Sequence, residues 1–269
     1  MKKTKSQIGL EPAIPQLTVT PYILKGKNAL ATLKEINNVI DSKYNGNDNL
    51  KVLRSGEINE VPTTFGSNPL ILPVVNQIIA PEFRIIKPEE LERTLQEGDP
   101  IRIQGNHYVD MGLVLDFSGN NHELAVQTFE GLPKELRDFD RLPAVMIGYG
   151  LRNTKFGDYG VMPKFQRGTE LRTAKILAEP TNNFDENDSE LIRTGLPSKL
   201  GSGKRRLYNS TQNKPSEDNL GISRFDLNSG RDLYSDYNGL SDSNADGRVV
   251  CVRAEGAEYS PIHRQITGR

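Results

Sequence analysis

Apolar residues recur at helical spacing in two segments of the chain. The first segment begins at Asn28, a suitable N-cap, ends at a polar Asn-Gly-Asn cluster over residues 45–47, and has its apolar positions at Ala29, Leu30, Leu33, Ile36, Val39 and Ile40. The second segment opens at Pro88, carries Glu89 and Glu90 in its first turn, buries Leu91 and Leu95, and stops at Gly98. Both patterns predict amphipathic helices.

After Gly98 the pattern changes to short apolar or alternating runs that predict strands. We expect strands at residues 101–104, 108–117, 122–129, 143–149 and 248–253, and a less regular strand at 170–178. The turn sequence Ser118, Gly119, Asn120 and Asn121 separates two of these runs and predicts a β-hairpin. Val249, Val250 and Val252 favour a pleated surface in the last strand.

Between residues 181 and 247 the composition shifts to Asn, Asp, Ser, Gly and Lys. A disordered linker has such a composition, and so has an ordered surface rich in loops. Evenly spaced apolar residues favour the ordered alternative from Leu220 onward, while both alternatives stay open for residues 181–219. The possible anchors are Leu191, Ile192, Leu196, Leu207, Leu220, Ile222, Phe225, Leu227, Leu233 and Leu240. We expect residues 1–80 to pack as an N-terminal portion against a main domain at 81–269.

Three groups of residues invite a chemical interpretation. Residues 242–247 match the start of a calcium loop, but Arg253 stands where such a loop needs a bidentate carboxylate. Residues 201–206 lack the first glycine and the Ser or Thr of a phosphate-binding loop, so a solvated basic loop is expected there. A third group could gather on the predicted hairpin and support a small metal-dependent hydrolase, which is the alternative function: Asp110, Asp116, His122 and Glu123.

Composition narrows the choice of function. The 269 residues carry a formal net charge of -1, which gives no general attraction to nucleic acid or to anionic membranes. One cysteine and three histidines leave little material for a metal site, and we expect neither metal nor cofactor. Because there is no apolar run long enough to span a membrane and the basic N-terminus is not followed by an apolar signal segment, we expect a soluble, cytoplasmic protein, with surface display left open.

The most informative stretch is residues 221–250, where two kinds of position interleave. Ile222, Phe225, Leu227, Leu233 and Leu240 can anchor the backbone, and Gly247 can turn the chain into the final strand. Between them stand residues of the types that binding surfaces favour, because tyrosine offers a large contact area and short polar residues offer adaptable hydrogen bonds. These residues are Arg224, Asp226, Asn228, Ser229, Arg231, Asp232, Tyr234, Asp236, Tyr237, Asn238, Asp242, Asn244 and Asp246.

This stretch resembles the C-terminal variable region of proteins diversified by diversity-generating retroelements, in particular the archaeal variable proteins. The resemblance implies an α+β, C-type lectin-like fold of the formylglycine-generating-enzyme type, β-rich with two or more helices and long ordered loops. It also implies codons mutated at adenine, which yield mainly Asn, Ser, Asp, Gly and Tyr. In that family, positions matching Leu233, Ser235, Leu240, Ser243, Gly247 and Arg248 would be scaffold, and the residues between them would be diversified.

Departures from related families limit the function that the resemblance implies. The single Cys251 leaves no cysteine pair for formylglycine-generating chemistry. Glu179, Pro180 and Thr181 are the nearest approach to a sugar-binding calcium motif, and tryptophan is absent. We therefore expect a non-enzymatic protein that binds a ligand, taken to be a protein surface, through exposed side chains of residues 224–246, with no prediction of its oligomeric state.

Overall fold

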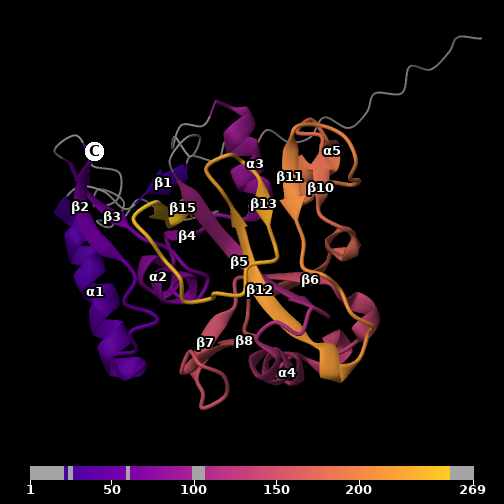
Figure 1. Ribbon diagram of the computed structural model, residues 1–269. Coiled ribbons are helices and arrows are strands. Elements are labelled where there is room, and N and C mark those ends of the chain that lie inside the picture. The colour runs from indigo at the N-terminus through magenta and orange to yellow at the C-terminus, as the bar shows by residue number, and fades with distance from the viewer. Residues whose placement is uncertain (1–20, 24–26, 59–60, 99–106, 255–269) are drawn as a thin grey trace, which may run out of the picture.

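The computed structural model describes residues 21–23, 27–58, 61–98 and 107–254, and this part of the chain is a mixed α+β structure (Figure 1). Its helices are α1 (Lys27–Lys43), α2 (Leu72–Ile79), α3 (Pro88–Gln96), α4 (His122–Glu130) and α5 (Ser189–Thr194). Its strands are β1 (Pro21–Ile23), β2 (Arg54–Ile58), β3 (Val61–Phe65), β4 (Phe83–Ile85), β5 (Tyr108–Asp116), β6 (Ala144–Ile147), β7 (Gly150–Asn153), β8 (Val161–Lys164), β9 (Glu170–Thr173), β10 (Asn182–Phe184), β11 (Arg205–Tyr208), β12 (Gly221–Leu227), β13 (Leu233–Tyr234), β14 (Gly247–Arg248) and β15 (Val250–Arg253).

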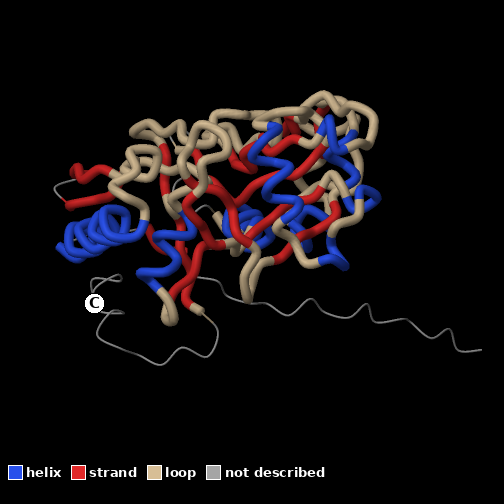
Figure 2. The backbone as a smooth tube through the Cα atoms, turned by 90° about the horizontal axis from the view of Figure 1, so that it is seen from below, coloured by secondary structure: helices blue, strands red, loops and turns tan. Residues whose placement is uncertain are grey.

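The main sheet, as far as the chain is described, has the order β10-β11-β13-β12-β5-β6-β9, and β14 also pairs with β5. The long antiparallel pair β5 and β12 forms its centre, whereas β11 with β13 and β14 with β5 are parallel pairs. A smaller sheet has the order β1-β15-β4, so strands from the two ends of the described chain are neighbours. Loops gather along one side of the molecule (Figure 2).

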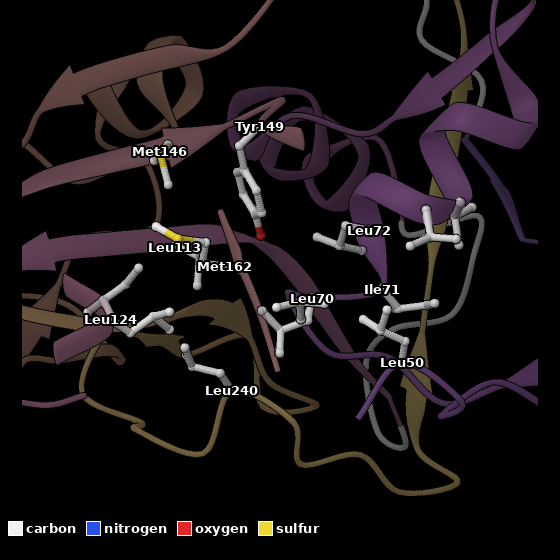
Figure 3. Packing of buried hydrophobic residues seen from close by; sticks show 14 of the residues in the cluster. Leu50, Leu70, Ile71, Leu72, Leu113, Leu124, Met146, Tyr149, Met162 and Leu240 are labelled. Atoms are coloured by element: carbon white, nitrogen blue, oxygen red, sulfur yellow. The ribbon is translucent and has the colours of Figure 1, made fainter. Parts of the chain in front are cut away.

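Hydrophobic residues pack on both faces of the central strands. Leu113 and Leu115 of β5 belong to one buried cluster, whereas Val114 belongs to another, as expected from the alternation of side chains along a strand. The first cluster also contains Ile71 of the N-terminal portion and Leu240 of the late chain, so residues on both sides of position 80 share one core. Figure 3 shows Leu240 within this cluster.

Several sequence predictions are confirmed. Helices occupy Lys27–Lys43 and Pro88–Gln96, although the first begins one residue before the predicted N-cap Asn28. Strands occupy Tyr108–Asp116 and Ala144–Ile147 as expected. The predicted anchors of the polar segment are all buried except the half-buried Ile192. Within residues 181–219 the structure contains α5, β10 and β11, which favours the ordered alternative. The strand predicted at 101–104 lies outside the described residues.

The predicted hairpin is wrong, because residues 122–130 form helix α4. Leu124, Ala125, Thr128 and Phe129 are buried together, a spacing that places them on one helical face. The Ser-Gly-Asn-Asn turn therefore leads from β5 into a helix: Asp116 Oδ1 accepts a hydrogen bond from Ser118 N at 2.9 Å at its start.

Two other strand predictions are corrected in part. The run at 170–178 is a strand only over Glu170–Thr173 and continues as a 3-10 helix over Lys175–Ala178. The run at 248–253 is divided between two sheets, because β14 pairs with β5 while β15 pairs with β1 and β4. The chain passes from the main sheet to the smaller sheet at Val249. The sequence does not show this change, because residues on both sides of Val249 favour strands.

Candidate binding surface

An open depression of about 420 Å³ lies over the ends of β5, β12 and β13. Its lining residues come from these strands, from the turn after β12 and from the loop before β14, and they are Tyr108, Arg224, Asp226, Asn228, Tyr234, Tyr237, Asp242, Ser243 and Asn244. Aromatic rings, carboxylates and side-chain amides make up almost the whole lining. Such a mixture suits recognition of a polar ligand with some apolar surface.

Arg224 forms the floor of the depression. Its side chain is 5 % exposed, and its Nη2 lies 2.7 Å from Oδ1 of Asp110, whose side chain is 0 % exposed. Nη1 of Arg224 also donates to the carbonyl of Asp242 at 2.9 Å, which ties β12 to the last loop. Although burial opposes the charge on Arg224, the carboxylates of Asp110 and Asp226 raise its pKa, so this guanidinium stays charged.

A β-bulge shapes the floor beside this ion pair. Phe225 is opposite Gly112, but the next residue of β12, Asp226, is opposite Asp110, so Met111 of β5 has no partner. An extra residue in one strand changes the direction of the side chains that follow it. The bulge thereby brings two carboxylates, Asp110 and Asp226, to the same guanidinium.

Asp226 is less well compensated than Asp110. Its Oδ1 is 3.8 Å from Nε of Arg224, too long for a hydrogen bond, and the residue is 8 % exposed. Burial raises the pKa of Asp226 to about 8, and the neighbouring carboxylates Asp110 and Asp236 add to the increase against the opposing attraction of Arg224. Asp226 therefore changes charge close to neutral pH.

Three tyrosines form the walls. The guanidinium of Arg224 lies 5.2 Å from the ring centroid of Tyr108 and 5.4 Å from that of Tyr237, within the range of cation–π attraction. Tyr237 Oη donates to Oδ2 of Asp242 at 2.6 Å. Tyr234 stacks on Tyr208 of the adjacent strand with 4.3 Å between centroids. The rings are thus held in place before any ligand arrives.

The loop between β13 and β14 is held to the rest of the protein by its own anchors. Leu240 is fully buried, and Ser243 Oγ accepts a hydrogen bond from the backbone N of Ser67 at 3.0 Å. Asn68 Nδ2 donates to the carbonyl of Ser241 at 3.0 Å. Asn244 Oδ1 accepts from its own loop, at 2.8 Å from Asp246 N. A loop with these contacts can present side chains without large changes of backbone.

Seven of the predicted ligand-binding residues line the depression: Arg224, Asp226, Asn228, Tyr234, Tyr237, Asp242 and Asn244. The remaining six are not among its lining residues. Of these, Ser229, Asn238 and Asp246 are exposed, and Arg231, Asp232 and Asp236 are half-buried. The expectation that all thirteen are exposed is wrong for Arg224 and Asp226, which are 4 % and 8 % exposed because they form the charged floor.

Most of the residues predicted as scaffold are buried and do not line the depression. Leu233, Ser235, Leu240 and Arg248 are buried, and Gly247 is buried where an added Cβ would lie 2.6 Å from the backbone N of Ser67. Ser243 is half-buried, and it contributes both a scaffold hydrogen bond and part of the lining.

Tyr108 also lines the depression, although it was not among the residues predicted to bind the ligand. Its ring lines the depression, and its Oη donates to the carbonyl of Ser67 at 2.9 Å. Tyr108 stands at the start of β5, far from the polar segment in sequence, and only the pairing of β5 with β14 brings it there. No local signal in the sequence could have identified it.

The four residues of the alternative hydrolase have separate partners. Asp110 pairs with Arg224, Asp116 accepts from Ser118 Oγ at 2.6 Å, and His122 Nδ1 lies 2.9 Å from the carbonyl of Leu220. Glu123 accepts a hydrogen bond from the backbone of a different loop, at 3.0 Å. The hairpin that would have opposed Asp116 and Glu123 is absent, and no group of three or more His, Cys, Asp or Glu side chains suited to a metal occurs among the described residues.

The calcium-like segment, the basic loop and Cys251 each make contacts within the fold. In the calcium-like segment, Asp242 accepts from Tyr237, and Asn244 caps its own turn. In the basic loop, Gly203 adopts a φ of +85°, and an added Cβ would lie 2.0 Å from the carbonyl oxygen of Phe184. Cys251 is buried in β15, and burial raises the pKa of its thiol to about 12.

Comparison with known proteins gives no relative for this chain: no protein-family model matches it, and neither a curated protein nor a solved structure is significantly similar. No helix in the described part of the chain is both long and apolar enough to cross a membrane. The geometry of the depression therefore carries the functional argument.

Proposed function

We propose that this protein is a non-enzymatic ligand-binding protein, and that the depression lined by Tyr108, Tyr234 and Tyr237 is its binding surface. The observation that carries the proposal is the interleaving within residues 224–247. Buried residues such as Leu233 and Leu240 alternate with polar residues that line one depression. The ligand proposed is a protein surface, because the depression is open and its walls are tyrosines and short polar side chains.

The rigid backbone beneath the lining residues supports a binding role. The central strands and the anchored loop hold the lining residues in place, so little conformational entropy is lost when a ligand binds. Asn244 is exposed at the rim, and substitutions at exposed positions usually change stability by about 0.5 kcal/mol or less. A surface of this kind can change its specificity without loss of the fold.

We further propose that the α+β structure is a C-type lectin-like fold and that a diversity-generating retroelement varies its depression. The palette of lining residues supports this, since Asn, Ser, Asp and Tyr are the products expected from adenine mutagenesis. Arg224 differs from these residues, because its buried ion pair with Asp110 makes it part of the scaffold.

The test is a comparison of the coding locus across a population of the source organism. The proposal predicts a nearby near-copy of the segment encoding residues 221–250 that differs mainly at adenines, together with a reverse-transcriptase gene. Codons for Asn228, Tyr234, Tyr237 and Asn244 should vary between individuals, while those for Leu233 and Leu240 stay constant. Uniform variation across all these codons, or a locus without any near-copy, would contradict the retroelement proposal.

A further inference from the structure

We propose that the depression accepts a positively charged side chain of the ligand, with Asp226 as its counter-ion. This inference rests on the proposed binding function of the depression and adds the chemistry of what enters it.

The charge balance of the lining becomes negative once Asp226 is ionised. Among the described residues that line the depression, Arg224 alone is cationic, and it is already paired with Asp110 at 2.7 Å. Asp226 and Asp242 both line the depression as well. Because Asp110 already offsets the charge of Arg224, ionised Asp226 and Asp242 leave the lining negative, so an incoming cation gains attraction and an incoming anion meets repulsion.

Asp226 lacks the partners that a buried carboxylate needs. Within the described residues its carboxylate has one ionic contact, with Arg224 at 3.8 Å, and no hydrogen bond. A buried ionised group without hydrogen bonds is costly, because its lost hydration is not replaced. A guanidinium or ammonium group in the depression would supply the missing donors.

The walls suit the same ligand. Tyr234 and Tyr237 line the depression beside Asp226, and Tyr237 is 44 % exposed. Aromatic faces attract organic cations, and Arg224 already shows this preference by lying against Tyr108 and Tyr237. The amides of Asn228 and Asn244 provide neutral acceptors at the rim.

The ionisation of Asp226 makes this binding depend on pH. A bound cation favours the ionised carboxylate, whereas burial raises the pKa of Asp226 to about 8 in the empty protein. Affinity should therefore increase as pH rises towards 8, by up to about tenfold per unit. The titratable or charged groups that face Asp226 are Arg224 on its own strand, Tyr108 and Asp110 on β5, Tyr234 on β13, and Asp236 and Asp242 on the following segment.

The experiment uses the full chain and two small probes whose termini are blocked and therefore uncharged. One is Nα-acetyl-arginine methylamide, and the other is its citrulline counterpart, which has the same shape without the side-chain charge. Binding is followed by NMR through the ring signals of Tyr234 and Tyr237, at about pH 6 and about pH 9. We expect weak binding of the arginine probe, stronger at the higher pH, and at least about tenfold weaker binding of the citrulline probe.

Two variants complete the design. Asp226→Asn should weaken binding of the arginine probe at least about tenfold at the higher pH and remove the pH dependence. Asp218→Asn makes the same change of charge at an exposed residue outside the depression and should leave binding unchanged. Thermal unfolding of each variant checks that the fold is kept.

Equal binding of the arginine and citrulline probes, or binding of the arginine probe that Asp226→Asn leaves unchanged, would overturn the cation inference. None of these results bears on the coding locus, so the proposed function stands or fails separately. A diversified locus with no cation binding would mean that the depression takes ligands of other chemistry.

Discussion

Arg224 provides the sharpest test of the structure beneath the depression. The substitution Arg224→Met keeps much of the apolar part of the arginine side chain and removes its charge. Asp110, whose side chain is 0 % exposed, then loses the guanidinium that lies 2.7 Å away. Removal of one partner of a buried ion pair costs about 3–5 kcal/mol, because the other charge stays buried and uncompensated. The hydrogen bond from Arg224 to the carbonyl of Asp242 is lost as well.

The cost should depend on pH in a defined direction. Burial already raises the pKa of Asp110 above its ordinary value of 3.8, and loss of Arg224 removes the main opposing effect. A carboxyl whose pKa is raised by folding contributes stability that is complete below its unfolded pKa and is lost as pH rises through its folded pKa. Arg224→Met should therefore be more destabilising near pH 8 than near pH 5, by up to about 1.4 kcal/mol per pH unit.

Urea unfolding at the two pH values measures this effect, and a second variant separates charge from packing. In Arg224→Met/Asp110→Asn both charges are gone, so most of the lost free energy of unfolding should return near pH 8. A cost below about 1 kcal/mol for Arg224→Met at that pH would refute the reasoning. So would a double variant no more stable than the single one.

Three further predictions concern neighbouring residues. Leu240→Ala should lower the free energy of unfolding by about 2–5 kcal/mol, whereas Ser229→Ala, at an exposed position in the turn between β12 and β13, should stay within about 0.5 kcal/mol in the same urea assay. Because folding raises the pKa of Asp226 to about 8, its ionisation destabilises the fold at higher pH, so Asp226→Asn should unfold at a higher urea concentration than the native protein near pH 9 but not near pH 4. Cys251, whose burial raises the pKa of its thiol to about 12, should react with a disulfide reagent in urea and not under native conditions; rapid native reaction would show that β15 opens.

Local patterns in the sequence predicted the parts of the fold that local chemistry determines. Pro88 with two following glutamates identified α3, and the even spacing of leucines identified the buried anchors of the late chain. The failure at residues 122–130 has a physical cause. Short apolar runs fit a strand or a helix, and the Gly-Asn turn before His122 favoured the wrong one.

The floor of the depression could not be predicted because it depends on long-range pairing. Asp110 and Arg224 are 114 residues apart, and only the register of β5 with β12 brings them together. A bulge within that register then adds Asp226 to the same guanidinium. Composition identified Arg224 and Asp226 as part of the surface, but not that they are buried beneath it.

The most direct test of the central claim compares two displayed libraries of the full chain. One diversifies five lining positions, Asn228, Tyr234, Tyr237, Asp242 and Asn244, and the other diversifies five interleaved buried positions, Leu227, Leu233, Ser235, Leu240 and Gly247. The measurement is the fraction of members that resist protease under native conditions. The account predicts that most of the first library and few of the second remain folded; similar fractions in the two libraries would contradict it.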